Sequence, residues 1–214
     1  KACRYSGSPY TADYAFAREK KEALLRAAFA RSGAAQRERD VAFAAENPWV
    51  EPYALFMAAK ERQNGAPWWE WPKELADYAG CQGRTELKDA AAFHVFVQRL
   101  FSEEWEQLKA YINGKGIGVI GDMPMYVSSC DVWSHRELFD LDLCTGRPCR
   151  VAGVPPDYFS ADGQLWGNPL YNWAAMERDG YAWWCARIGA AFSRFDVVRI
   201  DHFRAFASYW AVPA

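Results

Sequence analysis

The chain has 214 residues, enough for a sizeable core and for one or two ordinary domains. It carries 25 Lys and Arg against 27 Asp and Glu, and neither sign forms a long block, so nothing in the charge pattern favours a nucleic-acid partner. No apolar run approaches the roughly 20 residues that span a bilayer, and we expect a soluble, cytoplasmic protein with no membrane partner.

Cysteine and histidine are scattered along the chain. The six cysteines, Cys3 among them, include no C-x-x-C pair, and the three histidines lie far apart. Zinc and iron–sulfur sites need closely spaced His and Cys ligands, so we predict no metal, and nothing in the sequence calls for an organic cofactor. A chain of this size does not need a disulfide framework, and we expect reduced thiols.

The first half of the sequence is expected to be helical. One helix is predicted to begin at Tyr14 and to stop at Gly33, a residue typical of helix C-termini. The clearest helix begins at Thr85, because apolar residues then recur at three- and four-residue steps until Gly114. We therefore interpret residues 1–113 as a mostly helical region, an insertion or subdomain of the fold.

The pattern changes after the long helix. A short strand is predicted at residues 117–120 with Asp122 just beyond it, and a second strand at residues 196–201. Between them, residues 151–171 are rich in Gly, Pro and aromatic residues and are predicted to be a substrate loop, with a helical segment after it. This order is typical of a parallel α/β fold, in which ligands bind beyond the carboxyl ends of strands. We assign residues 114–214 to that α/β portion.

The second strand ends in charged residues. Arg199 and Asp201 are two positions apart, so their side chains share one face of the strand, and His202 follows directly. A carboxylate that attacks a sugar must stay ionised, and a neighbouring cation favours its ionised form. The alternative is that the pair is a structural salt bridge closing one layer of a barrel, with His202 merely hydrogen-bonded.

Aromatic residues make up 16% of the chain, and several fall in the predicted loop. Sugar rings stack on aromatic side chains, while polar groups such as Asn and His bind the hydroxyls. The loop offers this mixture in Tyr158, Phe159, Trp166, Asn168 and Tyr171. Together with the balanced charge of the chain, this favours a neutral or small polar substrate.

Longer motifs carry a family resemblance. The runs GDMPMYV, DVWSHRELFDLD, GRPCRVAGVPPDYFSADGQLWGNPLYNW and DVVRIDHFRAFASYWAVPA resemble 4-α-glucanotransferases of the amylomaltase or disproportionating-enzyme type, glycoside hydrolase family 77. YALFMAAK and WWEWP extend the resemblance toward the N-terminus. The resemblance implies part of a (β/α)8 barrel of the α-amylase type with helical insertions. It also implies an enzyme that cuts an α-1,4-glucosidic bond and passes the glucan to another maltooligosaccharide, with retention of configuration.

The resemblance also implies roles for individual residues. The family's nucleophile, the Asp of R-I-D-H, falls on Asp201, with Arg199 orienting it and His202 binding a sugar hydroxyl. The Asp of G-D-x-P-x-Y falls on Asp122, which is expected to contact the same sugar.

Four loop residues receive substrate-binding roles in the same way. The P-P-D-Y-F motif implies that Tyr158 and Phe159 cover the acceptor side, which would favour a sugar over water as acceptor. Trp166 and Asn168, in G-Q-L-W-G-N-P, are expected to line the cleft.

Two acidic motifs of the family do not occur in these 214 residues: the acid/base Glu of an A-E-D-L-G type strand and the Asp of an H-D type strand. A retaining mechanism needs an acid for the leaving oxygen, so we expect a fragment that is inactive alone. An unclosed barrel also predicts self-association through exposed strand edges. An α-amylase-like hydrolase and a noncatalytic carbohydrate-binding fragment remain as alternatives.

Overall fold

The computed structural model describes residues 5, 7, 8, 10–127 and 129–214, so Cys3 lies outside the described residues. The five cysteines within those ranges are free. No helix in the described part of the chain is long and apolar enough to cross a membrane.

The first half is helical, as predicted. Its elements are α1 (Tyr14–Ala30), α2 (Ala34–Glu46), α3 (Val50–Arg62), the 3-10 helices η1 (Trp68–Glu70) and η2 (Lys73–Leu75), α4 (Tyr78–Cys81) and α5 (Thr85–Asn113). The long helix α5 ends at a Gly114 C-cap, as its periodicity indicates. Gly33 is not the end of the first helix: Arg31 caps α1, and Gly33 is the N-cap of α2.

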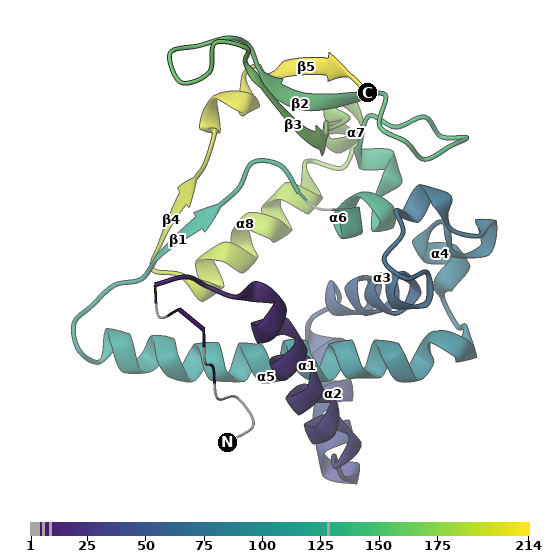
Figure 1. Cartoon of the computed structure of the whole chain (residues 1–214), viewed down its shortest axis with the longest axis vertical. Helices are drawn as coiled ribbons and strands as arrows, with labels where there is room; N and C mark the ends of the chain where they lie inside the picture. The colour runs from purple at the N-terminus through teal and green to yellow at the C-terminus, as the bar shows by residue number, and fades with distance from the viewer. Residues whose placement is uncertain (1–4, 6, 9, 128) are drawn as a thin grey trace.

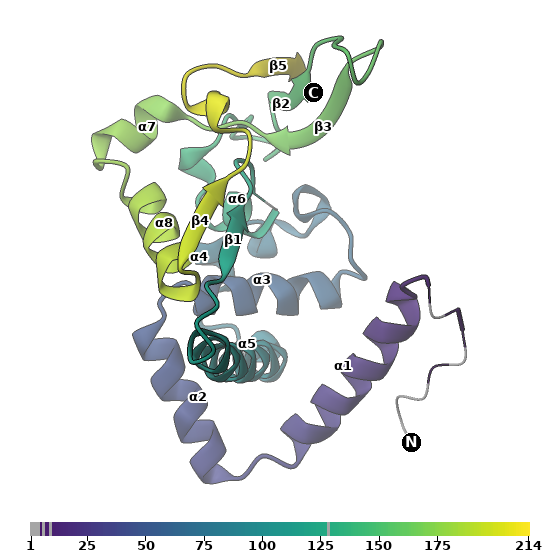
Figure 2. The same ribbon diagram turned by 90° about the vertical axis from the view of Figure 1, so that its left-hand side faces the viewer.

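The helices are arranged around α5 (Figures 1 and 2). Helix α3 packs along α5 and buries an apolar face that includes Val50, Phe56 and Ala59. Helix α1 buries no residue fully, and it contacts α5 through Phe29, whose ring lies 5.5 Å from that of Phe96. The region is therefore firmly packed at α3 and α5 and loosely covered by α1.

The second half contains the strands. Its elements are β1 (Ile120–Met123), α6 (Ser129–Ser134), η3 (Arg136–Leu138), β2 (Arg150–Val154), β3 (Gln164–Pro169), α7 (Trp173–Arg178), α8 (Ala182–Arg194), β4 (Val197–Ile200), η4 (Phe203–Phe206) and β5 (Trp210–Pro213). Strands β1 and β4 pair in parallel, with Asp122 opposite Arg199. This parallel pair, connected through helices, confirms the predicted α/β class (Figure 1).

The first strand lies three residues later than predicted. Residues 117–119 only approach the sheet, because the side chain of Asp196 and the start of β4 take up the backbone groups of Val119. Regular pairing begins at Ile120, which lies opposite Val197. Asp122 therefore belongs to the strand itself.

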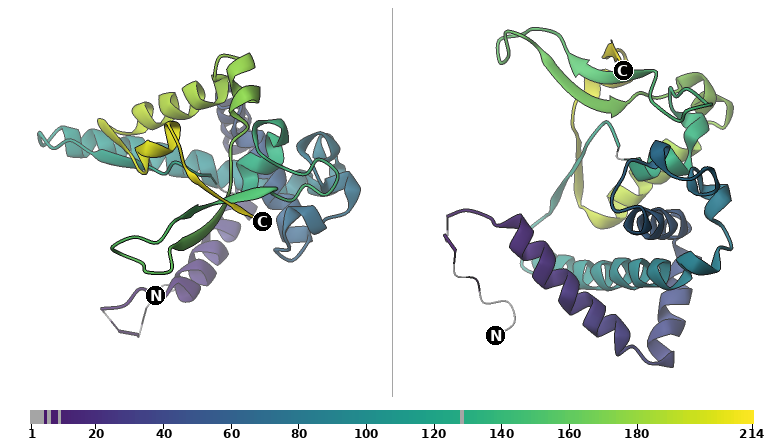
Figure 3. Two further views of the ribbon diagram at one scale, coloured as in Figure 1. Left: turned by 90° about the horizontal axis from the view of Figure 1, so that it is seen from above. Right: turned by 45° about the vertical axis from the view of Figure 1, so that its right-hand side comes forward.

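Two strands occupy about half of the predicted loop at residues 151–171. Strands β2 and β3 form an antiparallel hairpin, and β5 adds to its other edge in the order β3-β2-β5, seen above the parallel pair in Figure 1. The single helical segment predicted after it divides into α7 and α8, because Gly180 and Tyr181 both have positive φ. Figure 3 shows the hairpin extending away from the helices.

The core lies between α3 and the helices of the second half. Trp133 is 1% exposed, and its ring lies among those of Phe56, Trp71 and Tyr78. Its indole N–H donates to the carbonyl oxygen of Leu75 at 3.0 Å, so the polar end of the ring is also satisfied. This core supports the end of the parallel strand pair.

Candidate active site

Three charged side chains lie in one row on the β1–β4 pair. Because Asp122 and Arg199 are opposite one another and Asp201 is two positions beyond Arg199, all three share a face. Arg199 donates from Nε to Asp122 Oδ1 at 2.8 Å and from Nη2 to Asp122 Oδ2 at 2.6 Å. A longer bond of 3.4 Å joins Arg199 Nη2 to Asp201 Oδ1. The structure thus brings the predicted nucleophile, its cation and Asp122 together.

Arg199 makes its bidentate hydrogen bond to Asp122 and not to Asp201. A bidentate guanidinium–carboxylate pair is stronger than a single, longer hydrogen bond such as the one to Asp201. Hydrogen bonding to Arg199 holds the pKa of Asp122 below its ordinary value. All three side chains are more than half exposed, so the row is open to solvent on this chain.

Asp196 anchors the opposite end of β4, a role that the sequence analysis missed. Its Oδ2 accepts from the backbone N–H of Val119 and from Asn113 Nδ2, both at 2.7 Å, and Lys109 Nζ lies 3.3 Å from Oδ1. These bonds hold the pKa of Asp196 below its ordinary value. The two aspartates of DVVRID therefore differ: the first fastens the strand to α5 and β1, and the second lies in the charged row.

His202 turns the chain at the end of β4, with φ of 51°. Its ring lies 5.1 Å from that of Trp166 on β3, edge to face, and 6.2 Å from that of Tyr126. His202 Nε2 is buried without a hydrogen-bond partner in the described part of the chain. Asn168 lies two positions beyond Trp166 on the same strand and is half-buried. The hairpin thus places Trp166 beside His202 at the end of β4.

Tyr126 is a second residue that the sequence analysis did not single out. It follows β1, is 7% exposed, and its ring lies 6.0 Å from Trp166 and 6.3 Å from both Tyr171 and Tyr209. Its hydroxyl is buried without a partner among the described residues. The available signal was its place in GDMPMYV, four residues after Asp122.

Tyr158 and Phe159 are not brought to the charged row. They lie in the turn between β2 and β3, where they are 97% and 88% exposed, and their rings contact each other at 5.7 Å. Asp157 organises this turn by accepting the backbone N–H groups of Phe159 and Ser160. The pair is presented on a hydrogen-bonded turn rather than on a disordered loop.

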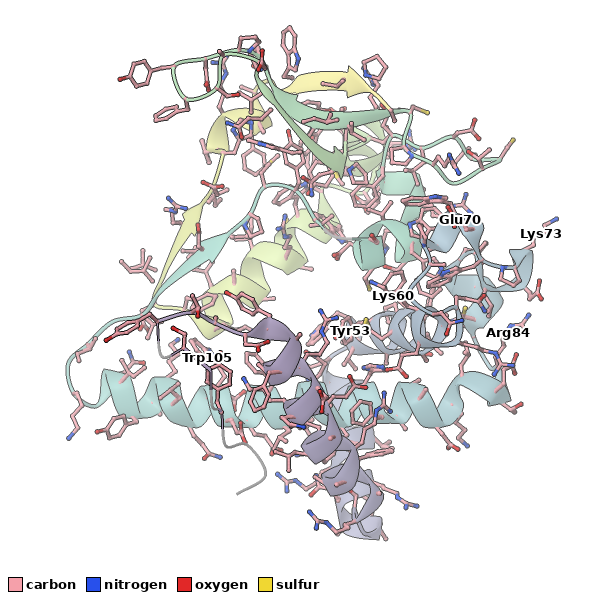
Figure 4. All side chains as sticks on the ribbon, in the orientation of Figure 1. Tyr53, Lys60, Glu70, Lys73, Arg84 and Trp105 are labelled. Carbon is pink, nitrogen blue, oxygen red and sulfur yellow. The ribbon has the colours of Figure 1, made fainter. Side chains whose placement is uncertain are left out.

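The helical region contains cavities that are separate from the charged row. One of about 710 Å³ lies between α1, α3 and α5, where Figure 4 labels Tyr53 and Lys60. Another, of about 370 Å³, lies where α2 meets α5 beside Trp105, whose indole N–H donates to the carbonyl oxygen of Arg194. Among the described residues, no group of three or more His, Cys, Asp or Glu could hold a metal ion.

Asp122 on β1 and Asp201 directly after β4 lie toward the carboxyl ends of two parallel strands, with a histidine and aromatic rings beside them. This end of the strands is where α/β proteins bind their ligands. The chain belongs to the 4-α-glucanotransferase family, whose model matches residues 3–214. It is 50% identical over 171 residues to the 4-α-glucanotransferase of Thermus thermophilus, covering 78% of this chain and 34% of the relative. It is 48% identical over 175 residues to the 4-α-glucanotransferase of Synechocystis, and that match covers 79% of this chain and 34% of the relative.

A solved structure matches the whole arrangement. The amylomaltase of Streptococcus agalactiae, in complex with acarbose, has a TM-score of 0.89 at 39% identity, over 98% of this chain and 44% of that one. This likeness confirms the expected fold class, part of an α/β fold of the amylomaltase type. The chain spans about a third of the length of the curated relatives it matches.

Proposed function

We propose that the complete protein containing this chain is a 4-α-glucanotransferase that moves α-1,4-glucan segments between maltooligosaccharides. The observation that carries the proposal is the row in which Arg199 joins Asp122 to Asp201, with His202 and Trp166 beside it. Family membership and the likeness to an acarbose-bound amylomaltase support it.

The reaction we propose is a double displacement. An oxygen of Asp201 attacks the anomeric carbon, and the bond from that carbon to the leaving glucan's oxygen breaks as an acid protonates that oxygen. The 4-hydroxyl of an acceptor glucan then displaces Asp201, and the hydroxyl proton returns to the acid. Two inversions give net retention. Asp122 and His202 would bind hydroxyls of the sugar being transferred.

Asp122 is unsuited to be that acid. A general acid must hold its proton near neutral pH, whereas Arg199 keeps the pKa of Asp122 low. We infer that the acid is a glutamate outside these 214 residues, so this chain alone would be inactive.

The hairpin would favour transfer over hydrolysis. Tyr158 and Phe159 expose nearly their whole rings at its turn. Exposed rings of this kind suit the apolar face of an incoming sugar. Covering the acceptor side would exclude water, while Trp166 and Asn168 would line the cleft.

Maltotriose is the substrate for the test, with the complete protein and its Asp201→Asn variant run side by side. Transfer predicts glucose together with maltopentaose and longer chains, and no products from the variant. Separation of the products by chain length measures the outcome.

The same experiment separates the alternatives. Glucose and maltose alone would indicate an α-amylase-like hydrolase. Unchanged maltotriose, with binding that is weakened in the variant, would indicate a noncatalytic carbohydrate-binding protein. We propose a cytoplasmic location, which free cysteines in the described part of the chain support, because thiols stay reduced there.

A further inference from the structure

The segment Pro124–Tyr126, directly after β1, is held by two side chains from distant parts of the chain. Arg187 on α8 donates from Nη2 to the carbonyl oxygen of Pro124 and from Nη1 to that of Met125, the latter at 3.1 Å. Tyr171, after β3, donates its hydroxyl to the same Met125 oxygen at 2.6 Å. Two consecutive carbonyls are therefore fixed by one charged and one neutral donor. Tyr171 is only 3% exposed, so it holds the Met125 carbonyl from within the core instead of offering its ring to a sugar.

Arg187 occupies an unusual place for a cation. Its guanidinium carbon lies 4.9 Å from the ring centre of Trp184 and 5.4 Å from that of Trp183. Burial lowers the pKa of Arg187, with the neighbouring charge of Asp131 acting in the opposite direction. Burying a charge is costly unless it is well bonded, so the two carbonyls and the Trp faces offset a real penalty.

The segment that Arg187 holds carries one wall of the candidate site. Asp122 lies two residues before Pro124, and the ring of Tyr126 contacts those of His202 and Trp166. Tyr171 also stacks on Tyr126, at 6.3 Å and 14° between the rings. A shift of the two carbonyls would therefore move Tyr126 away from the residues that we expect to bind the sugar.

We propose that Arg187 is a positioning residue of the sugar-binding site: by holding the carbonyls of Pro124 and Met125, it keeps Tyr126 packed against His202 and Trp166. This inference rests on the proposed function for the identity of the ligand. Lysine should not replace Arg187, because its compact ammonium lacks the planar fork of N–H donors with which the guanidinium reaches both carbonyls while lying over the Trp184 ring.

The test uses the complete protein with Arg187→Lys, and with Arg178→Lys as the control, because Arg178 is exposed at the end of α7. For Arg187→Lys we expect kcat/KM on maltotriose and affinity for acarbose each to fall about tenfold or more, since small misplacements of binding groups are costly. The control should stay within about twofold of wild type. Backbone hydrogen exchange should speed up within residues 120–127 and not across the molecule.

Tyr126 provides a second variant. Tyr126→Leu should reproduce the loss seen in Arg187→Lys, because it removes the ring that packs against His202 and Trp166 and leaves the backbone carbonyls of Pro124 and Met125 in place.

The outcomes distinguish the two proposals. If wild type neither converts maltotriose nor binds acarbose, the proposed function is wrong. The positioning role of Arg187 in a sugar-binding site is then wrong as well. If wild type does either, the inference is overturned by an Arg187→Lys variant with unchanged kinetics and affinity. Exchange that rises uniformly through the molecule would also overturn it, because Arg187 would then be a general stabiliser.

Discussion

Arg199 makes it possible for two carboxylates to lie on one face of a two-stranded sheet. Asp122 and Asp201 would repel each other there, and the guanidinium between them turns that repulsion into two attractive contacts. The fork is planar, so its two parallel bonds to Asp122 also fix where Nη2 points, toward Asp201. Orientation of Asp201 is therefore indirect and depends on Asp122.

Replacing Arg199 with lysine should expose this dependence. Lys keeps the charge but makes a single contact, so we expect kcat/KM of the complete protein to fall by about tenfold or more. The pKa of Asp122 should rise toward its ordinary value, since Arg199 is what lowers it. If activity needs ionised Asp122, the acidic limb of the rate–pH profile moves to higher pH.

The matched control is Arg204→Lys, because Arg204 is exposed in η4 only five residues away. It should leave the rate and the profile unchanged. An Arg199→Lys variant with the wild-type rate–pH profile would show that the ionisation of Asp122 does not depend on the bidentate bond from Arg199.

The sequence could predict the charged residues of the row but not which of them pair. Asp122 and Asp201 each follow an apolar run, and parallel strands bring such ends to one edge of a sheet. Which carboxylate receives the fork depends on the register of β1 on β4, which no local pattern specifies. Tyr126 was missed for a similar reason, since its importance comes from ring contacts with residues far away in sequence.

At the scale of elements, β1 is fitted closely against the end of α8. A Cβ added to Gly121 would lie 2.1 Å from Cδ2 and 2.3 Å from Cγ of Phe195. Phe195 is itself held by Trp105 of α5, with ring centres 5.6 Å apart. The glycine thus lets the strand, the helix end and α5 meet.

Gly121→Ala should therefore destabilise the protein by about 1–3 kcal/mol, the usual cost of overpacking a filled interior. Gly118→Ala is the control three residues earlier, where the nearest atom to the added Cβ is 3.9 Å away. Thermal unfolding of both variants measures the difference. Equal melting temperatures would mean that Phe195 moves aside freely.

Local patterns predicted some elements well for clear physical reasons. Helix α5 repeats apolar residues over 29 positions, so its signal accumulates along its whole length. The β2–β3 hairpin has no such signal, because Gly153 in β2 and Gly167 in β3 interrupt the alternation of side chains, and β5 joins the hairpin from more than 40 residues beyond β3. These strands are held by pairing with residues distant in the sequence, so a local pattern cannot predict them.

At the scale of the whole molecule, the parallel pair is open on both sides. Within the described ranges β1 pairs only with β4, and apolar side chains near it are exposed: Ile117 at 59%, Ile120 at 71%, Phe192 at 59% and Val197 at 54%. Unpaired strand edges offer backbone donors and acceptors to any other strand. In the longer relatives, the remaining two-thirds of the protein supplies the chain that could cover such edges.

The 214-residue chain produced by itself is therefore expected to self-associate through β1 and β4. Light scattering should give a mass above that of one chain, 24.4 kDa, and the mass should rise with concentration. Ile120→Lys together with Val197→Lys should lower it, because charges at exposed edge positions disfavour strand addition and apolar contact. Leu143→Lys is the control, since Leu143 is 74% exposed in the turn before β2 and far along the chain from either edge. A clean monomer that melts sharply would instead mean that the exposed strand pair is stable unpartnered, and that the helices beneath it supply enough core for independent folding.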